Sequence, residues 1–412
     1  MGEKIVITGL GTINPLGKSV IESWENLLKG VSGVGLITNC DTSDLLVKIA
    51  CEVKDFKPEE YIPAKEVRRR DRYEQFATIA AAEAIRQAGL TVKPLNPQRV
   101  GVVISSAIGG FSSLVEGESV RVSAGARKIS PFIIPMLMSN GAAGMLTIDY
   151  GFQGPSFSVA SACASGADGI GTAWTLLRTG AIDVAVTGGS EATITPLGIA
   201  AFDRIGAMSR RNEDFSMTPQ PFDLHRDGFI MGEGAGVLVL ERESHARARG
   251  VEILAELAAY AATSDGFHIT APSEDGSGGA RAIQQALEIA GEDPQAVGYI
   301  NAHGTATVLN DLSETKAVKL ALGSHAYQVP ISSTKSMTGH MMGATGAVEA
   351  IFCVQAIRSG ILPPTIHYET PDPECDLDVI PNQSREKKVR LAISNAFGFG
   401  GHNAVLVVRE YN

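Results

Sequence analysis

Short apolar runs rich in β-branched residues alternate with alanine-rich stretches along the chain. We expect strands over residues 4–8, 99–105, 183–187, 235–241, 298–301, 329–332, 390–394 and 404–409. We expect helices over residues 65–88, 166–177, 278–290, 313–322 and 346–358. Some strand candidates, such as 237–240 and 404–408, are apolar at every position, which is typical of strands buried on both faces. Their alternation with helices predicts a layered α/β fold.

A weak internal repeat accompanies this pattern. Gly-Ala at 166–167 is followed by Arg-Thr-Gly at 178–180, and Gly-Ala at 346–347 is followed by Arg-Ser-Gly at 358–360, an offset of 180 residues throughout. An alanine-containing helix is expected between the markers in both copies. Glycine and alanine are common here, so chance is one explanation. A duplicated half with a boundary near residue 250 is the other, and it explains the length of the chain without a linker.

Composition narrows the classes of function. The 412 residues include 35 Lys and Arg against 45 Asp and Glu, a net charge of −10. Such a balance argues against nucleic-acid binding, and at first sight against an acidic protein partner. The longest uncharged stretches are broken by Gly, Ser, Asn or Pro, which argues against a membrane span, and the Ile-Val-Ile run at 5–7 resembles a first strand more than a signal peptide. Five scattered cysteines without a Cys-x-x-Cys pair favour a reducing cytoplasm over a disulfide framework or a zinc site.

Cys163 is the first candidate for chemistry. It lies where a strand-like run gives way to very small residues and a helix begins. A thiol at such a turn points out of the sheet, and the helix N-terminus favours its thiolate, so a nucleophilic role is one interpretation. Most free cysteines are buried packing residues, and a structural role is the alternative.

Two histidines occupy similar positions. His303 follows an expected strand, and His340 lies in a turn before an expected helix, five residues after Lys335. A lone histidine is usually a structural hydrogen-bonding residue. Two histidines and a cysteine that each follow a strand indicate a site assembled from several loops, because sites of α/β proteins gather at strand ends.

The segment 394–403 near the end of the chain alternates phenylalanine and glycine, with Phe397 and Phe399 separated by one glycine. Such a segment predicts a flexible loop that presents aromatic faces. A simple turn before the last strand is the alternative, although a turn alone requires no phenylalanine.

Together these segments resemble the β-ketoacyl-acyl-carrier-protein synthases, the condensing enzymes of fatty-acid synthesis, and most closely their synthase II type. The resemblance runs along essentially the whole chain, through the blocks at 6–11, 226–236 and 301–305 to the phenylalanine-glycine segment. It implies a thiolase-like α/β fold with two similar halves stacked as α-β-α-β-α layers, usually as a homodimer. Residues 1–250 would form the half with the nucleophilic cysteine, and residues 251–412 the half with the two catalytic histidines.

The resemblance also implies a reaction. Cys163 would take the acyl chain from acyl-carrier protein as a thioester, and the carbanion left when malonyl-carrier protein loses carbon dioxide would attack it, extending the chain by two carbons. N–H groups of His303 and His340 would stabilise the enolate. Lys335 would orient the His340 loop, and the backbone N–H groups of Cys163 and Phe399 would hold the oxyanion of acyl transfer.

Further roles follow from the same resemblance. Thr305 and Thr307 would bind the pantetheine arm together with Thr270, while Phe397 would contact substrate and Phe399 would gate the acyl pocket. No cofactor is implied, because the substrates carry phosphopantetheine on the carrier. Some relatives place a monovalent cation near residues that correspond here to Glu349, Ser394 and Asn395.

Acyl-carrier proteins are small and acidic, so a local basic face is expected in spite of the net charge. The expected docking residues are Lys65, Arg68, Arg69, Arg204 and Arg210. A solvated helix face is the usual alternative for such a charge run. The chain departs from the family pattern nearby, with Gly206 where many relatives have arginine and Val-Leu-Asn-Asp at 308–311 in place of Pro-x-Gly-Asp.

Four other functions share parts of this pattern. A thiolase would need a second cysteine as base, and a synthase III initiator would pair its cysteine with one histidine and one asparagine. A non-catalytic chain-length-factor-like subunit would lack the nucleophile. A stand-alone polyketide ketosynthase uses the same reaction and the same triad, so the residues leave that alternative open.

Overall fold

The computed structural model of the protein describes residues 3–91 and 95–412. Within these two stretches, ten strands join in the order β10-β9-β13-β14-β8-β1-β7-β6-β4-β5. Their bounds are β1 Ile5–Ile13, β4 Val100–Ser105, β5 Ser156–Phe157, β6 Val184–Glu191, β7 Gly234–Arg242, β8 Ala255–Ser264, β9 Tyr299–Asn301, β10 Ile331–Ser332, β13 Leu391–Gly398 and β14 His402–Arg409. Two small sheets pair β2 (Gly35–Leu36) with β3 (Ile49–Ala50) and β11 (Ile361–Leu362) with β12 (Arg385–Glu386).

The ten strands form two five-stranded sheets of the same topology. β1 runs antiparallel to β7 and β7 antiparallel to β6, while β6, β4 and β5 are parallel. β8, β14, β13, β9 and β10 repeat this arrangement in the same order. The two sheets are joined by a short pairing of β1 with β8, at Val6 with Glu256 and Ile7 with Ala255.

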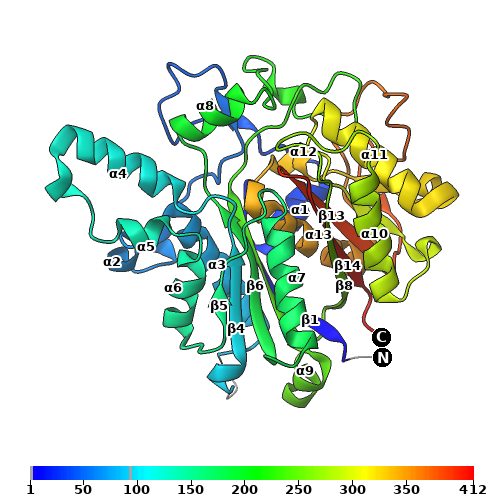
Figure 1. The fold of residues 1–412 in the computed structure, drawn as a ribbon, viewed down its shortest axis with the longest axis horizontal. Coiled ribbons are helices and arrows are strands. Elements are labelled where there is room, and N and C mark those ends of the chain that lie inside the picture. The colour runs from blue at the N-terminus through cyan, green and yellow to red at the C-terminus, as the bar shows by residue number, and fades with distance from the viewer. Residues whose placement is uncertain (1–2, 92–94) are drawn as a thin grey trace.

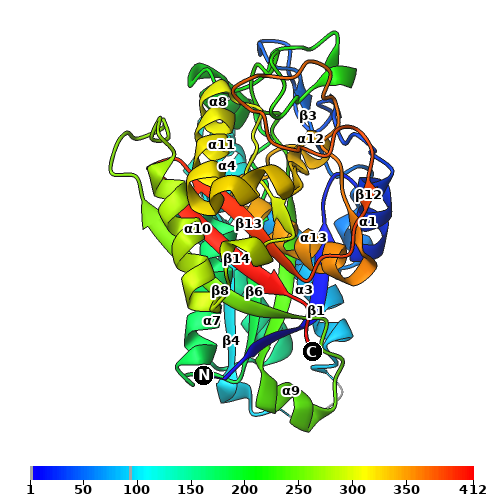
Figure 2. The same ribbon diagram turned by 90° about the vertical axis from the view of Figure 1, so that its right-hand side faces the viewer.

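Helices complete five layers (Figures 1 and 2). α3 (Arg72–Gln87) and α6 (Gly141–Tyr150) cover the outer face of the first sheet, and α10 (Ser277–Ala290) and α11 (Val308–Leu322) that of the second. α7 (Ser165–Arg178) and α13 (Thr345–Ser359) lie between the sheets. The expectation of two similar halves in α-β-α-β-α layers is therefore confirmed. The exact division into residues 1–250 and 251–412 stays a prediction.

Other helices lie outside these layers: α1 (Val20–Leu28), α2 (Ala64–Val67), α4 (Phe111–Ala124), α5 (Ile133–Leu137), α8 (Pro196–Arg204), α9 (Glu243–Arg249) and α12 (Lys335–Thr338). α4 and α5 form an arm that projects from the body of the molecule (Figure 1). No helix in the described residues combines the length and the apolar character that crossing a bilayer requires.

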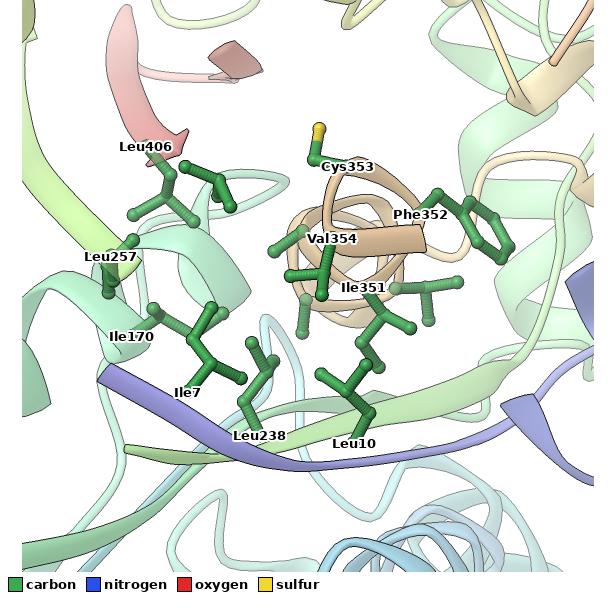
Figure 3. Close-up of a cluster of buried hydrophobic side chains, with 14 of the residues drawn as sticks. Ile7, Leu10, Ile170, Leu238, Leu257, Ile351, Phe352, Cys353, Val354 and Leu406 are labelled. Atoms are coloured by element: carbon green, nitrogen blue, oxygen red, sulfur yellow. The ribbon is translucent and has the colours of Figure 1, made fainter. Parts of the chain in front are cut away.

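The middle layer carries the largest hydrophobic core (Figure 3). Side chains from both sheets converge on α7 and α13, and those labelled in the figure include Ile7, Leu238, Leu257, Leu406, Ile170 and Ile351. A helix with sheets on both sides must be apolar around most of its circumference, which explains the nearly continuous apolar sequence of α13. This core holds the two halves together.

The internal repeat has a physical cause in this layer, where α7 and α13 pack against each other. A Cβ added at Gly166 would lie 2.6 Å from the carbonyl oxygen of Gly343, and one at Gly346 would lie 3.0 Å from the backbone nitrogen of Ala167. Glycine is favoured at both positions because the two helix N-terminal ends approach this closely. The Gly-Ala pairs at 166–167 and 346–347 are therefore equivalent positions of the two halves.

Several elements differ from the expected ones, and two of these differences have a clear physical cause. The single helix expected over 65–88 is interrupted, because Asp71 caps a new helix through a capping box. The Asp71 side chain accepts a hydrogen bond from the backbone of Glu74, and the Glu74 side chain accepts one from the N–H of Asp71. The strand β8 was not predicted at all. Its sequence, Ala-Glu-Leu-Ala-Ala-Tyr-Ala-Ala-Thr-Ser, is rich in alanine, which local β-propensity disfavours, and pairing with β14 and β1 overrides that preference.

Gly166→Ala tests the helix contact. The added methyl group would meet the backbone of Gly343, so we expect a loss of about 1–3 kcal/mol in the free energy of unfolding. The matched control is Gly144→Ala in α6, where an added Cβ meets nothing within 4 Å and alanine should stabilise the helix by about 0.5–1 kcal/mol. Denaturant titration measures both. Equal effects of the two substitutions would contradict the contact.

Candidate active site

Cys163 lies in a tight turn between β5 and α7. Ala162, just before it, has a φ of +51°, an uncommon conformation for a residue with a side chain. Hydrogen bonds close the turn: the N–H of Ser161 donates to Ser165 Oγ at 2.9 Å, and the N–H of Ala164 donates to the Ser161 carbonyl at 3.1 Å. The cysteine is held in place with only 8% of its surface exposed.

The three residues expected to act together do meet. Cys163 Sγ lies 3.0 Å from His340 Nε2, and the rings of His303 and His340 are 5.4 Å apart and nearly perpendicular. All three line one cavity of about 280 Å³. The N-terminal end of α7 contributes the thiol, the turn before α13 contributes His340, and the turn after β9 contributes His303.

Burial controls the charge of the thiol. It raises the pKa of Cys163 to about 12, while the positive charge of Lys335 and the backbone N–H groups of Phe399 and Cys163 act in the opposite direction. The N–H groups at the start of α7 act in the direction expected, toward the thiolate, but burial opposes them. The desolvation penalty of a buried anion is larger than the stabilisation that these groups supply.

Both histidines are neutral. Burial is the main reason that the pKa values of His303 and His340 lie well below the usual range, and the charge of Lys335 lowers both further. Lys335 Nζ donates to Glu349 Oε1 at 2.7 Å, and both side chains are buried. Burial raises the pKa of Glu349 to about 7, with Lys335 opposing the shift. Lys335 thus acts on the imidazoles through its charge, and its hydrogen bond goes to Glu349.

The 226–236 block supports His340. The N–H of His340 donates to the Ile230 carbonyl at 2.7 Å, and the N–H of Gly232 donates to the His340 carbonyl at 2.8 Å. The ring of Phe229 packs edge-on against the imidazole with centroids 5.5 Å apart. On the far side of the ring, Nδ1 lies 3.2 Å from Thr345 Oγ1. The sequence marked this block as family-like, but its contact with the histidine required the fold.

A buried carboxylate supports His303. Glu314, on α11, accepts hydrogen bonds from the N–H groups of His303 at 2.8 Å and Gly304 at 2.7 Å, and from Asn395 Nδ2 at 3.0 Å. Its three donors belong to the His303 turn and to β13. Glu314 therefore sets the backbone of the turn and leaves the imidazole directed to the cavity.

The expected substrate contacts line the same cavity, namely Thr270, Thr305, Thr307, Phe397 and Phe399. Thr305 Oγ1 lies 2.9 Å from Thr307 Oγ1, so the two hydroxyls form one polar edge. The Phe397 ring lies 5.9 Å from that of His303. Gly398 rests on the nucleophile turn, where an added Cβ would be 2.9 Å from the Ser161 carbonyl oxygen, so this loop approaches Cys163 more closely than any side chain allows.

The three residues considered for a cation are all buried, and Glu349 among them pairs with Lys335. Within the described part of the chain, Glu349 Oε2, Ser394 Oγ and Asn395 Oδ1 have no hydrogen-bond partner. Oxygen atoms of this kind are the ligands that a hard cation prefers, so the set fits such an ion. No cluster of three or more His, Cys, Asp or Glu residues suited to a metal occurs in residues 3–91 and 95–412.

The expected docking residues are in two separate places. Lys65 and Arg68 are exposed at α2, while Arg204 on α8 is exposed in another region of the molecule (Figure 1). Ile205, next to Arg204, lines the mouth of the cavity. Two of the five are engaged within the chain. Arg69 pairs with Glu66 and lies over the Phe132 ring, and Arg210 pairs with Asp203 at 2.7 Å.

The fold and the site define a condensing enzyme of the thiolase type. The family models for the N-terminal and C-terminal domains of β-ketoacyl synthases match residues 2–246 and 254–369. The chain is 46% identical over 409 residues to a 3-oxoacyl-[acyl-carrier-protein] synthase 2 of Synechocystis, covering 99% of this chain and 98% of that protein. A Staphylococcus aureus protein of the same name is also 46% identical, with 99% of each chain covered.

A solved structure supports the same assignment. A type II polyketide ketosynthase in complex with its acyl-carrier protein matches with 35% identity and a TM-score of 0.90, covering 100% of both chains. The chain belongs to the β-ketoacyl synthase family, and it is an acyltransferase.

The neutral histidines make a prediction about pH. His303 stays uncharged in the folded protein, but in the unfolded chain it takes up a proton below about pH 6.5. The unfolded state then binds more protons, so wild type loses stability as the pH falls, by up to about 1.4 kcal/mol per pH unit from this residue. We expect His303→Gln to become less destabilising relative to wild type between pH 7.5 and pH 5.5. Urea unfolding at both pH values measures this difference, and a constant difference would contradict the neutral assignment.

Proposed function

We propose that the chain catalyses decarboxylative condensation of malonyl-acyl-carrier protein with an acyl group on Cys163, giving a β-ketoacyl-carrier protein two carbons longer. The observation that carries the proposal is the buried thiol 3.0 Å from His340 Nε2, with the His303 ring beside it in the same cavity. The names of the 46% identical relatives support the carrier-bound substrate and the 3-oxoacyl product.

In the first half-reaction, the Cys163 sulfur attacks the carbonyl carbon of the acyl thioester. A thiol with a pKa of about 12 needs a base, and His340 Nε2 is in position to take its proton and pass it to the departing carrier thiol. The N–H groups of Cys163 and Phe399, which already favour negative charge on the sulfur, are available to the tetrahedral oxyanion.

In the second half-reaction, the malonyl group loses carbon dioxide and negative charge collects on its thioester oxygen. The neutral imidazoles of His303 and His340 donate N–H hydrogen bonds to that oxygen. The resulting carbanion attacks the carbonyl carbon of the acyl-Cys163 thioester. The bond between that carbon and the Cys163 sulfur breaks, and the released thiolate takes up a proton from solvent. Thr345 allows His340 to act in both half-reactions. Its hydroxyl can accept from Nδ1 or donate to it, so the ring can carry its proton on either nitrogen.

Lys335 has a supporting role in this proposal. Burial and the charge of Lys335, which pairs with Glu349, together keep both imidazoles neutral, so that His340 Nε2 remains free to accept the proton of Cys163. A monovalent cation beside Glu349, Ser394 and Asn395 would supply partners to their unpartnered oxygens and stabilise this region electrostatically. The reaction itself uses no cofactor, because the carrier brings the pantetheine arm to Thr270, Thr305 and Thr307.

A polyketide ketosynthase is the second candidate, since one such enzyme matches the whole chain at 35% identity. The higher identity to the synthase 2 proteins favours fatty-acid elongation. A chain-length-factor-like subunit is disfavoured, because Cys163 and both histidines are present and line one cavity, with the Cys163 sulfur 3.0 Å from His340 Nε2.

We also propose that the protein is a homodimer in the cytoplasm. The α4–α5 arm carries exposed apolar side chains that a second copy would cover, among them Leu114, Val122, Phe132, Ile134 and Met138. β5 stands at the end of the sheet order, and a second copy could pair with this edge.

The five cysteines are free, which suits a reducing compartment such as the cytoplasm.

Cys163→Ala is the direct test of the nucleophile. Incubation with a long-chain acyl-carrier protein should add the mass of one acyl group to wild type and none to the variant. Because alanine leaves the buried turn almost unchanged, the variant should keep the wild-type unfolding midpoint. An acyl adduct that persists on the folded variant would disprove the assignment.

Docking is tested by charge reversal. Lys65→Glu with Arg68→Glu, and separately Arg204→Glu, should raise the apparent KM for carrier-bound substrate on the order of tenfold at low salt, with less effect at high salt. Lys388→Glu, an exposed cation after β12, is the control and should leave the KM unchanged. A group whose reversal changes nothing is not part of the docking face.

A further inference from the structure

A hydrogen-bonded chain of three side chains lies behind the nucleophile turn and connects the two halves of the fold. Ser161 Oγ donates to Asp168 Oδ2, and the Tyr260 hydroxyl donates to Asp168 Oδ1 at 2.7 Å. Ser161 precedes Cys163 by two residues, Asp168 lies in the first turn of α7, and Tyr260 lies on β8 of the other half. Through this chain, Tyr260 of the second half is connected to the turn that carries Cys163 in the first half.

The Tyr260 ring packs directly against the backbone of α7. Gly171 follows Asp168 by three residues and faces the same side of the helix, where an added Cβ would lie 2.2 Å from Cγ of the Tyr260 ring. Burial and the nearby Asp168 carboxylate raise the pKa of the Tyr260 hydroxyl, so it remains a donor. Neither Asp168 nor Tyr260 lines the active-site cavity, and the reaction outlined above uses neither.

The turn that these residues support is strained. A residue such as Ala162, held at a φ of +51°, costs on the order of 1–3 kcal/mol and keeps this conformation only when its surroundings fix it. The Ser165 hydroxyl donates to the Ala162 carbonyl at 2.6 Å and accepts from the Ser161 N–H, which fixes the backbone from one side. The Ser161 side chain is fixed from the other side by Asp168, through a charge-assisted hydrogen bond.

We propose that Asp168 and Tyr260 are positioning residues that hold Cys163 for attack by anchoring Ser161, a proposal that rests on the nucleophilic role of Cys163. Asp168 accepts from both hydroxyls at once, so the carboxylate transmits the position of β8 to the turn. Loss of either bond frees the turn to relax from the left-handed conformation. The sulfur then moves relative to His340 and to the N–H group of Phe399, and small displacements of reacting atoms have large effects on rate.

Tyr260→Phe is the decisive variant, because it removes the hydroxyl and keeps the ring on Gly171. We expect kcat for condensation to fall about tenfold, because a displacement of 1 Å can lower the rate about a hundredfold and a smaller one is expected here. The KM for carrier-bound substrate should stay within about twofold of the wild-type value. The rate at which iodoacetamide alkylates Cys163 should fall in parallel, since it reports on the sulfur without any turnover. Asp168→Ala should have a similar effect, and the double variant should lose little more than either single one.

Trp174→Phe is the matched control. Trp174 Nε1 donates to the Leu257 carbonyl at 2.9 Å and so joins the same helix to the same strand, but it does not reach the nucleophile turn. Both variants lose one buried hydrogen bond, so their unfolding midpoints should fall by similar amounts. Only Tyr260→Phe should slow alkylation and kcat.

Two results would overturn the proposal: wild-type alkylation and kcat in Tyr260→Phe, or equal losses in Tyr260→Phe and Trp174→Phe. Failure of the proposed function has a different signature. Wild type would then take no acyl group from the carrier, whereas the alkylation rates of the variants would still report on the geometry of the turn.

Discussion

The close approach of α7 and α13 is the constraint on which the site depends. Their N-terminal ends meet at Gly166 and Gly346, where an added Cβ would lie only 2.6 Å and 3.0 Å from the nearest backbone atoms of the facing segment. Cys163 lies just before the first helix and His340 just before the second, so the same contact brings the thiol to within 3.0 Å of the imidazole. A bulkier residue at either glycine would push the two halves apart, and it would move the thiol away from the imidazole at the same time. Fold stability and site geometry are therefore one requirement in this protein.

Burial is the second determinant, and it favours the neutral form of four groups of the site, namely Cys163, His303, His340 and Glu349. It keeps the Cys163 thiol protonated and both histidines neutral, and it raises the pKa of Glu349 to about 7. The positive charge of Lys335 opposes the effect of burial at Cys163 and Glu349 and adds to it at the two histidines. A site of this kind stabilises charge only when the reaction creates it, which suits a reaction whose negative charge develops first on one oxygen and then on another.

Much of the fold was predictable from the sequence because its strands and helices follow simple periodicities. The continuous apolar runs identified β7 and β14, and the Gly-Ala repeat pointed to equivalent helices in two halves. Prediction failed where tertiary contacts override local preference. Alanine-rich β8 is a strand because β14 and β1 pair with it, and the expected long helix is interrupted after Val67, and a capping box at Asp71 starts another helix.

For the site, the sequence by itself determined which residues are present: a cysteine and two histidines after strands, a lysine, and a phenylalanine-glycine segment, in the order of a known family. It also limited the protein to a class, since the blocks are long and specific. Only the tertiary structure decided how these groups behave. The protonation of Cys163, the pairing of Lys335 with Glu349 and the support of Ser161 by Asp168 and Tyr260 depend on burial and on contacts between distant segments. Residue identity is local, whereas desolvation and distance are properties of the folded chain.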